Sequence, residues 1–397
     1  MNAAREPMST GAWAPVEFTE FVAIRRDIHA HPELGFGEHR TAALVARLLA
    51  GWGYQVTTGI GGTGVVGQLR KGSGARRLGI RADMDALPID EKTGLAWTST
   101  VSGVMHACGH DGHTAALLAA ARVIAENVDF DGTLNLIFQP AEEGAGGALR
   151  MMEDGLFERF PCDAVFALHN MPGIETGHFM FRSGATMASS DDVTIHLSGV
   201  GGHGAMPHTT IDVVVAASSI VMALQSIVAR NVDPQETAVV SVGALQAGRA
   251  GNVIPDSARL ELSVRALDPT VRALLKRRIL ELVDLQAASY GVKAKVDWRD
   301  GYAVLVNDVA QTALAVEVAT RLFGPQRVTA NGRRFTASED FAFMLEKIPG
   351  CYFFVGNGAS GSPGACMVHN PGYDFNDAIL EPAARFWAAL TAEFLQG

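Results

Sequence analysis

The stretch GTLNLIFQPAEEG, residues 132–144, contains a short apolar run, Leu134 to Phe138, that ends in Gln139, Pro140 and two glutamates. An apolar run of this length between predicted helices is typical of a central strand that is buried on both faces of a sheet. Three other stretches have the same character: RRLGIRADMD (76–85), CDAVFALHN (162–170) and CYFFVGNG (351–358). Together they predict an α/β fold with a mainly parallel sheet covered by helices.

Chemically useful side chains follow three of these apolar runs directly. Asp83 and Asp85 follow the apolar run in 76–85. Glu142 and Glu143 follow Leu134 to Phe138, and His169 follows the run in 162–170. In open α/β sheets, ligands bind beyond the carboxyl ends of the strands. The sequence therefore predicts one site that receives residues from several strand ends.

The middle of the chain has a different pattern of apolar and polar residues. Its strand-like stretches alternate between apolar and polar residues, which is typical of a sheet with one wet face. Two helical stretches lie between them, one at 211–228 and one that begins at Asp268 and Pro269. The order β-α-β-β-α-β predicts a ferredoxin-like domain. We place it at 188–299, inserted into a large domain formed by 1–187 and 300–397.

Composition excludes some partners and favours one compartment. Of 397 residues, 48% are hydrophobic and 19% charged, with a formal net charge of −10. This acidity argues against nucleic acid or an anionic membrane as the main partner. Neither a signal peptide nor an uninterrupted apolar stretch of membrane-spanning length is predicted. No C-x-x-C motif occurs, and the few scattered cysteines favour a reducing cytoplasm; they are Cys108, Cys162, Cys351 and Cys366.

The stretch VMHACGHDGHTAALLAAARVIAE, residues 104–126, crowds Cys108, His110 and Asp111 before a predicted helix. A thiolate and an imidazole two residues apart can bind a borderline-soft metal ion, and a helix N-terminus favours the thiolate. The plainer interpretation is an inert cysteine in a glycine-rich turn. We expect Asp111 and His113 to support the site without binding the ion.

The other candidate ligands indicate a metal site only when they are considered as a set. A Glu-Glu pair alone is usually a solvated turn, and a lone histidine such as His169 or His369 usually has a structural role. A cysteine, three histidines and a glutamate nevertheless form the ligand set of a two-metal site. So many metal ligands besides Cys108 argue against a thiol hydrolase that uses Cys108 as its nucleophile. A non-catalytic metal-binding protein would be expected to lose the proton carrier, yet Glu142 is present.

Ten motifs in order resemble the M20 metallopeptidase family, in particular its amidohydrolase branch of hippurate hydrolases, N-acyl-amino-acid amidohydrolases and auxin-conjugate hydrolases. The resemblance covers nearly the whole chain. The motifs are HPELGFGE, RADMDALP, MHACGHDGHTA, QPAEEG, ALHN, GGHGAMPH, NVIPD, VRALD, SEDFAF and VHNPGYDFND. Two departures are Val200, where lysine is frequent, and Gly204, where alanine is usual.

The resemblance implies a role for each matching residue. Cys108 would bridge two divalent ions (Zn, Mn, Ni or Co), with His110 and His369 completing one metal site and Glu143 and His169 the other. Further roles are implied outside this ligand set: Glu142 as general base, Asp85 as the group that orients a ligand, His203 as the group that polarises the scissile carbonyl, Asn252 and Arg265 as substrate-binding residues, and Glu339 near the metals. Two plainer interpretations remain open, namely Arg265 as a polar-face strand residue and Asp83 as a strand-end cap.

The implied function is metal-dependent cleavage of the amide bond of an N-acyl amino acid to a carboxylic acid and a free amino acid. The alternative is a dipeptidase or carboxypeptidase of the same family. The implied partner is a small-molecule substrate, with no nucleic acid and no membrane. The resemblance also implies a homodimer or higher homo-oligomer in which the inserted lid or dimerisation domain brings His203 to the neighbouring active site.

Overall fold

The computed structural model describes residues 17–396, and these divide into two compact units. The first contains the described residues up to Gly184, then Val306–Arg333, then those from Phe343 onward; the second contains Ala185–Leu305 and Arg334–Ala342. The N-terminal residues on which the signal-peptide prediction rests lie outside the described part of the chain. Each unit is described by itself below.

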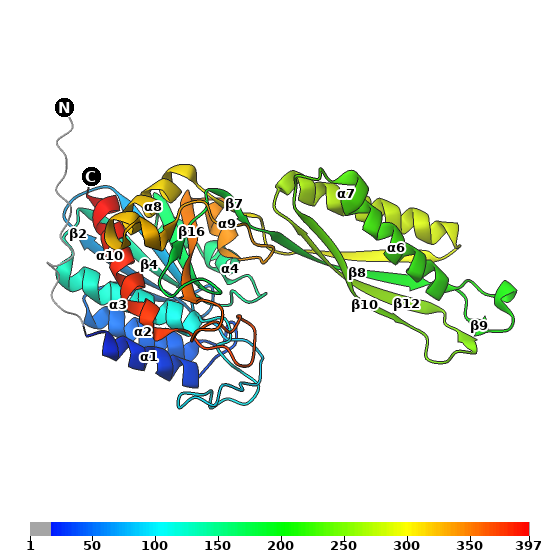
Figure 1. Ribbon diagram of the computed structural model, residues 1–397, viewed down its shortest axis with the longest axis horizontal. Coiled ribbons are helices and arrows are strands. Elements are labelled where there is room, and N and C mark those ends of the chain that lie inside the picture. Colours follow the sequence, from blue (N-terminus) through cyan, green and yellow to red (C-terminus); the bar gives the residue numbers. More distant parts are fainter. Residues whose placement is uncertain (1–16, 397) are drawn as a thin grey trace. The chain divides into compact units, whose positions relative to one another are not determined.

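The first unit contains an eight-stranded sheet (Figure 1). Its strands, in spatial order, are β1 (Gln55–Ile60), β2 (Gly64–Lys71), β4 (Gly132–Gln139), β3 (Arg77–Asp83), β5 (Ala164–Pro172), β16 (Gly350–Gly358), β6 (Phe179–Met180) and β15 (Val328–Thr329). The four strands predicted from apolar runs are the neighbours β4-β3-β5-β16, and all three pairs among them are parallel. Antiparallel pairs occur where β1, β2 and β4 meet and between β16 and β6. The predicted fold class is confirmed.

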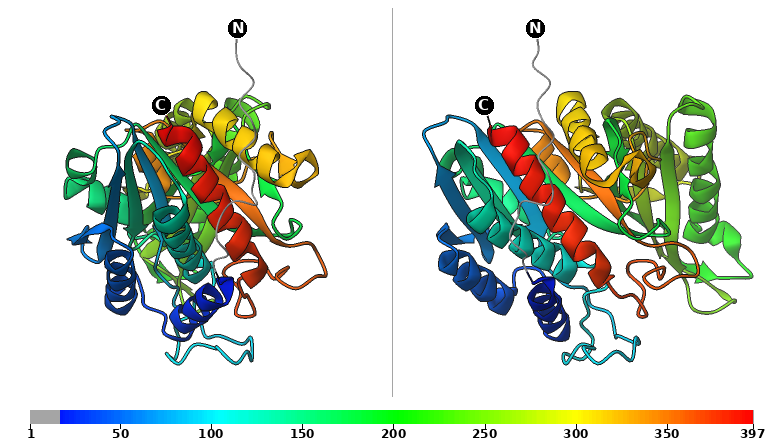
Figure 2. Two further views of the ribbon diagram at one scale, coloured as in Figure 1. Left: turned by 90° about the vertical axis from the view of Figure 1, so that its left-hand side faces the viewer. Right: turned by 60° about the vertical axis from the view of Figure 1, so that its left-hand side comes forward.

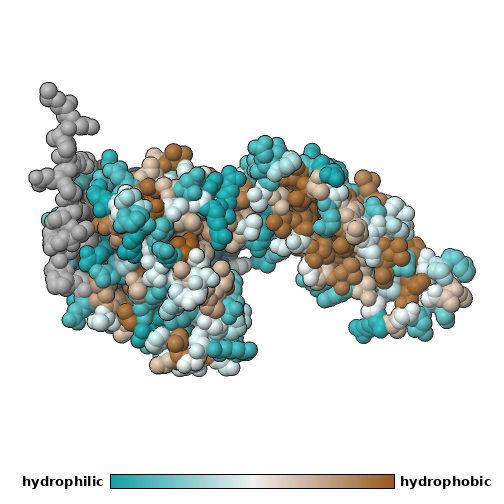
Figure 3. All heavy atoms as spheres, viewed as in Figure 1, coloured by the Kyte–Doolittle hydropathy of each residue, from teal (hydrophilic) through white to brown (hydrophobic). Residues whose placement is uncertain are grey.

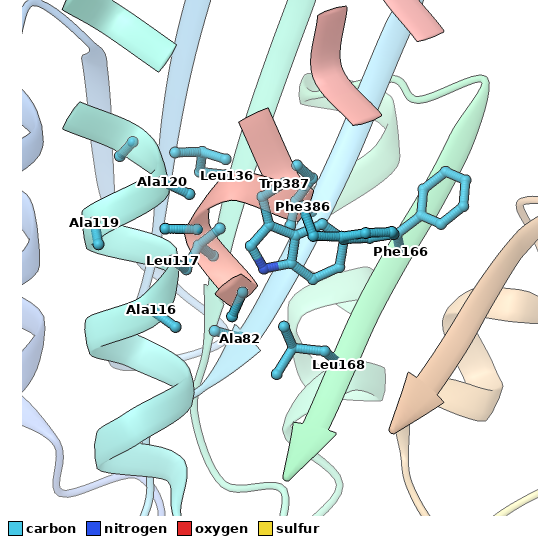
Figure 4. Close-up of a cluster of buried hydrophobic side chains, with 14 of the residues drawn as sticks. Ala82, Ala116, Leu117, Ala119, Ala120, Leu136, Phe166, Leu168, Phe386 and Trp387 are labelled. Atoms are coloured by element: carbon cyan, nitrogen blue, oxygen red, sulfur yellow. The ribbon is translucent and has the colours of Figure 1, made fainter. Parts of the chain in front are cut away.

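Helix α3 (His110–Asn127) is nearly all buried because it lies between the sheet and other helices. It packs most closely against α10 (Leu380–Leu395), and Figure 2 shows the two helices side by side over the sheet. Alanines on α3 let the helices approach, and Trp387 of α10 fills the space between α3 and the strands (Figure 4). This packing fixes the first turn of α3, and with it Cys108 and His110, against the ends of the strands.

The remaining helices of this unit cover the sheet and its edges. Two lie near the N-terminus of the described chain, and helix α1 of this pair contacts α3. The other helices and short elements that the first unit contains in whole or in part are α1 (Phe18–Ala30), α2 (His39–Gly51), α4 (Gly147–Glu153), α5 (Leu156–Arg159), α8 (Val309–Phe323), α9 (Phe341–Leu345), β14 (Leu305–Asn307), η2 (Pro325–Arg327) and η3 (Asp377–Ile379).

The second unit has the predicted β-α-β-β-α-β order. Its elements are β8 (Ser189–Ser198), α6 (Val213–Asn231), β10 (Ala238–Ala247), β12 (Ser257–Ala266), α7 (Pro269–Ser289) and β13 (Lys293–Asp300), with β7 (Gly184–Met187), β9 (Gly202–His203), η1 (Pro207–Thr209) and β11 (Val253–Ile254) as short additions. The sheet order is β10-β12-β8-β13 and every neighbouring pair is antiparallel, which is the ferredoxin-like arrangement. Asp268 caps α7 through the backbone N–H groups of Thr270 and Val271, as predicted.

The second unit also includes 334–342, whereas the sequence pattern predicts this segment in the large domain. The backbone of Phe335 donates to Thr186 O (2.9 Å), and Ala188 N donates to both Phe335 O (3.1 Å) and Ala337 O (2.9 Å). These bonds join segments that are far apart in the sequence. No local pattern predicts such a pairing, so the sequence placed the boundary wrongly at this segment.

Helix α6 is long and apolar enough to cross a membrane, judged by length and composition alone. One such helix is weak evidence, because core helices pass the same test. In the structure its apolar residues recur at helical spacing and pack on the sheet of the second unit; they are Val213, Ala216, Ala217, Ile220, Leu224 and Ile227. Apolar side chains also reach the surface of this unit (Figure 3), including Val215, Met222 and Leu285.

Candidate metal centre

The predicted ligands of the first unit come together at the carboxyl ends of its strands. The ligand atoms of Cys108, His110 and His169 lie within 4.8 Å of one another, and so do those of Cys108, Glu143 and His369. Cys108 belongs to both groups, which is the arrangement that a bridging ligand requires. Glu142 forms a third group of this kind with His110 and Glu143.

The division of ligands between two ions differs from the one implied by the family resemblance. That division pairs His110 with His369 and Glu143 with His169. In the structure, His369 Nε2 lies 3.1 Å from Glu143 Oε1, whereas His169 Nε2 lies 3.3 Å from Cys108 Sγ in the group that contains His110. These distances favour a pairing of His110 with His169 and of Glu143 with His369, which we carry forward as a proposal. Distances between loops decide this, and the order of motifs along the chain carries no such information.

Hydrogen bonds orient the candidate ligands. Asp85 contacts His110 Nδ1 (3.1 Å) through one oxygen and accepts from the Glu143 backbone N–H (2.9 Å) through the other. His169 Nδ1 donates to Asn170 O (2.6 Å), which leaves Nε2 facing Cys108. His110 Nε2 is buried without a hydrogen-bond partner. Because buried polar atoms normally have hydrogen-bond partners, this nitrogen of His110 fits a site for a cation.

The backbone at this site is strained. Among residues 17–396, the non-glycine residues with positive φ are Phe36 (63°), Ala141 (52°) and His369 (63°). Ala141 precedes Glu142, His369 is a candidate ligand, and Phe36 follows Gly35, where an added Cβ would lie 3.0 Å from Ala141 Cβ. Such conformations cost about 1–3 kcal/mol each and persist only where the surroundings enforce them. The ligand geometry is therefore set by the folded chain.

Electrostatics at the site favour a cation over a reactive thiol. Burial, and then the carboxylates of Glu143 and Glu142, raise the pKa of the Cys108 thiol well above its usual range. Burial and neighbouring histidines lower the pKa of His169, so its imidazole is neutral and able to bind a metal. Burial opposes charge on His110, yet Asp83 and Asp85 raise its pKa to about 10. A thiol with a raised pKa is a weak nucleophile, which disfavours the thiol-hydrolase alternative.

A buried ion network that the sequence does not predict lies next to the candidate ligands. Arg25 of α1 is fully buried and donates to Asp377 (2.7 Å), to Asp374 (2.8 Å) and, more weakly, to Asp111 (3.4 Å). The network ties α1 and the first turn of α3 to the C-terminal loop that carries His369. Asp111 is one of the carboxylates of this network, and its supporting role at the site stays a prediction. Arg25 lies in an ordinary helical pattern, so no sequence signal marked it.

His29 makes this network sensitive to pH. Burial alone would lower the pKa of His29, but the carboxylates of Asp111 (2.8 Å) and Glu91 (3.3 Å) outweigh burial and the nearby Arg25 and raise the pKa to about 9. His106 also faces this ring.

We expect His29 to contribute stability that is complete below pH 6.5, the unfolded-state pKa, and that is lost as the pH rises towards 9. The contribution is on the order of 2 kcal/mol. Chemical denaturation of wild type and His29→Gln at pH 6 and pH 9 measures it: the difference in unfolding free energy should shrink at pH 9. A His29 difference independent of pH contradicts the expectation.

The other predicted residues belong to the second unit. His203 is exposed and its Nδ1 accepts from Ala205 N (3.0 Å), so the ring proton lies on Nε2. Exposed Asn252 accepts from Gly204 N (2.8 Å) through its backbone, which places it beside His203. Half-buried Arg265 donates to Thr336 O (3.0 Å), and Glu339 accepts from Phe341 N (3.0 Å). The substrate roles of His203, Asn252 and Arg265, and the place of Glu339 near the metals, stay predictions.

Comparison with known proteins decides the family. Residues 79–393 match the model of peptidase family M20/M25/M40. The chain belongs to this family. As an M20 member it is 48% identical to a hippurate hydrolase of Campylobacter jejuni, over 95% of this chain and 97% of the relative. It is 39% identical to an N-acetyl-L-cysteine deacetylase of Bacillus subtilis, over 92% and 86% of the two chains.

Solved structures agree with this M20 assignment. A putative aminohydrolase from methicillin-resistant Staphylococcus aureus superposes with a TM-score of 0.88 at 34% identity, covering 96% of this chain and 97% of the other. A dinuclear metal-binding M20 peptidase from Bacillus subtilis gives 0.83 at 33% identity, covering 95% and 98%. The predictions of family, fold and enzyme class, a hydrolase acting on amide bonds, are confirmed.

Proposed function

We propose that this chain is a metal-dependent amidohydrolase that cleaves N-acyl amino acids to a carboxylic acid and a free amino acid. The observation that carries the proposal is the buried Cys108 thiol, shared by two groups of ligand atoms, with the Glu142 carboxylate in contact with the same cluster. Relatives named for the hydrolysis of hippurate and the deacetylation of N-acetylcysteine support the substrate class.

The cofactor we propose is a pair of divalent ions, held by Cys108 with His110 and His169 on one side and with Glu143 and His369 on the other. A shared thiolate and three imidazoles suit Zn²⁺, Co²⁺, Ni²⁺ or Mn²⁺ better than Mg²⁺. When bound, such a pair polarises a carbonyl and lowers the pKa of water.

The side chains of the protein handle the proton and the substrate. Glu142 takes a proton from the water that attacks the amide carbon and returns it to the leaving nitrogen as the C–N bond breaks. Asp85 holds His110 and Glu143 in place during these steps. His203, protonated on Nε2, donates to the carbonyl oxygen, where negative charge develops. Arg265 and Asn252 bind the substrate carboxylate.

A substrate panel tests this proposal against the dipeptidase or carboxypeptidase alternative. The purified enzyme is assayed with N-benzoylglycine, N-acetylated amino acids and indole-acetyl amino acids, and with dipeptides that carry a free amino terminus. We expect kcat/KM for the best N-acyl amino acid to exceed that for every dipeptide by at least about a hundredfold. A dipeptide would bring its charged amino terminus into the site, and a buried charge without a partner costs several kcal/mol. Faster cleavage of the dipeptides would reverse the assignment.

We also propose that the enzyme works in the cytoplasm as a homodimer through the second unit, with His203 acting on the partner's substrate. Complementation tests this arrangement. Inactive Glu142→Gln and inactive His203→Ala chains are mixed under conditions that exchange subunits. Restored activity supports action in trans, because one site of each heterodimer then has both residues intact. A mixture that stays inactive despite proven heterodimers rules it out.

A further inference from the structure

Asn170, the residue after His169 on β5, is fully buried and uses every polar group it has. Its side-chain Nδ2 donates to Cys108 O (2.7 Å), and its Oδ1 accepts from the Tyr373 hydroxyl (2.7 Å). Its backbone N–H donates to His113 Nε2 (3.0 Å), and its backbone carbonyl accepts from His169 Nδ1 (2.6 Å). One residue thus contacts two candidate ligands and two further buried side chains.

The partners of Asn170 are themselves fixed. His113 Nε2 accepts a hydrogen bond from a backbone N–H, so the ring proton must lie on Nδ1. That proton is donated to Asp83 Oδ1 (2.6 Å), and Asp83 Oδ2 accepts from Arg81 (2.7 Å). These linked hydrogen bonds hold Asn170 in one position. Asp83 therefore does more than cap its strand.

Three ligand-bearing segments converge on the contact between Asn170 and Tyr373. Cys108 lies in the turn before α3, His169 lies on β5, and Tyr373 lies four residues after His369, with its backbone N–H bonded to Asn370 O (2.9 Å). The turn is packed tightly against the contact, since a Cβ added at Gly109 would lie 2.3 Å from Asn170 Nδ2 and 2.4 Å from the Tyr373 hydroxyl. A shift of either side chain would therefore move the Cys108 turn.

We infer that Asn170 and Tyr373 are positioning residues of the metal centre: their contact couples the Cys108 turn to the His169 strand and the His369 loop, so that the thiolate is held where both ions need it. Both side chains act through other residues, because their polar atoms bond to Cys108 O, to His113 and to each other. The inference rests on the proposed function, because it assumes that Cys108 bridges two ions.

The experiment titrates the metal-free protein with Co²⁺ and follows the near-ultraviolet absorption of the cobalt–thiolate bond. Tyr373→Phe removes a single oxygen atom. We expect it to weaken Co²⁺ binding about tenfold and to lower the thiolate band, because losing a group that orients metal ligands typically has this effect. Asn170→Ala should do the same. In the double variant, Co²⁺ affinity should fall by less than the product of the two single-variant factors, since both side chains act through one contact.

Tyr54→Phe is the matched control. Tyr54 is also buried in the first unit, and its hydroxyl donates to Ala121 O (2.9 Å) away from the ligands. It should lower the melting temperature of the metal-free protein as Tyr373→Phe does, yet bind Co²⁺ as tightly as the wild type. Wild-type affinity and an intact band in both Tyr373→Phe and Asn170→Ala would overturn the inference, as would equal weakening in Tyr54→Phe. A wild-type protein without any thiolate band would instead overturn the proposed metal centre, and this inference with it.

Discussion

Replacing Cys108 by alanine should reduce the bound metal from two ions per chain to at most one and lower kcat/KM by roughly a thousandfold, because several kcal/mol of transition-state stabilisation depend on the metal pair. Cys108 belongs to both groups of ligand atoms, so its loss removes a ligand from each. Elemental analysis and steady-state kinetics of the purified variant measure both effects.

Cys162→Ala is the matched control for Cys108→Ala. Cys162 is another buried free cysteine, and its thiol contacts Phe160 O (3.4 Å) rather than the ligand cluster. It should keep two ions and near wild-type turnover. Two tightly bound ions in Cys108→Ala would remove the bridging role.

Glu142→Gln should keep both ions and lower kcat by about 10²–10⁴-fold, because only the transfer of a proton is lost. The adjacent Glu143→Gln is its matched variant and should lose metal as well as activity, since Glu143 shares a ligand group with Cys108 and His369. Metal content and kcat of the two variants separate the roles of neighbouring glutamates. Near-normal kcat in Glu142→Gln would show that another group carries the proton.

Much of the fold could be predicted because its signals are local. The buried strands are continuous apolar runs, and the strands of the second unit alternate, so strand type and order follow from short windows of sequence. The place where Asp83, Glu142 and His169 meet follows from the rule that parallel strands end at the same edge of a sheet. Asp268 and Pro269 marked the start of α7 for an equally local reason.

What could not be predicted depends on contacts between distant segments. The pairing of 334–342 with the start of β8, the ion network of Arg25, and the division of the ligands between two ions all join parts of the chain that share no sequence pattern. Asn170 illustrates the same limit: it stood inside a recognised motif, but its importance appears only once Tyr373 is brought to it.

We propose that two divalent ions held around Cys108 drive the hydrolysis of N-acyl amino acids. The most direct test strips the enzyme with a chelator and restores Zn²⁺, Mn²⁺, Co²⁺ or Ni²⁺ in steps, while the release of glycine from N-benzoylglycine, or of the amino acid from the best substrate of the panel, is measured. We expect the stripped enzyme to be inactive and its activity to rise to a plateau at two ions per chain. Full activity in the stripped enzyme, or a plateau reached at one ion per chain, would contradict it.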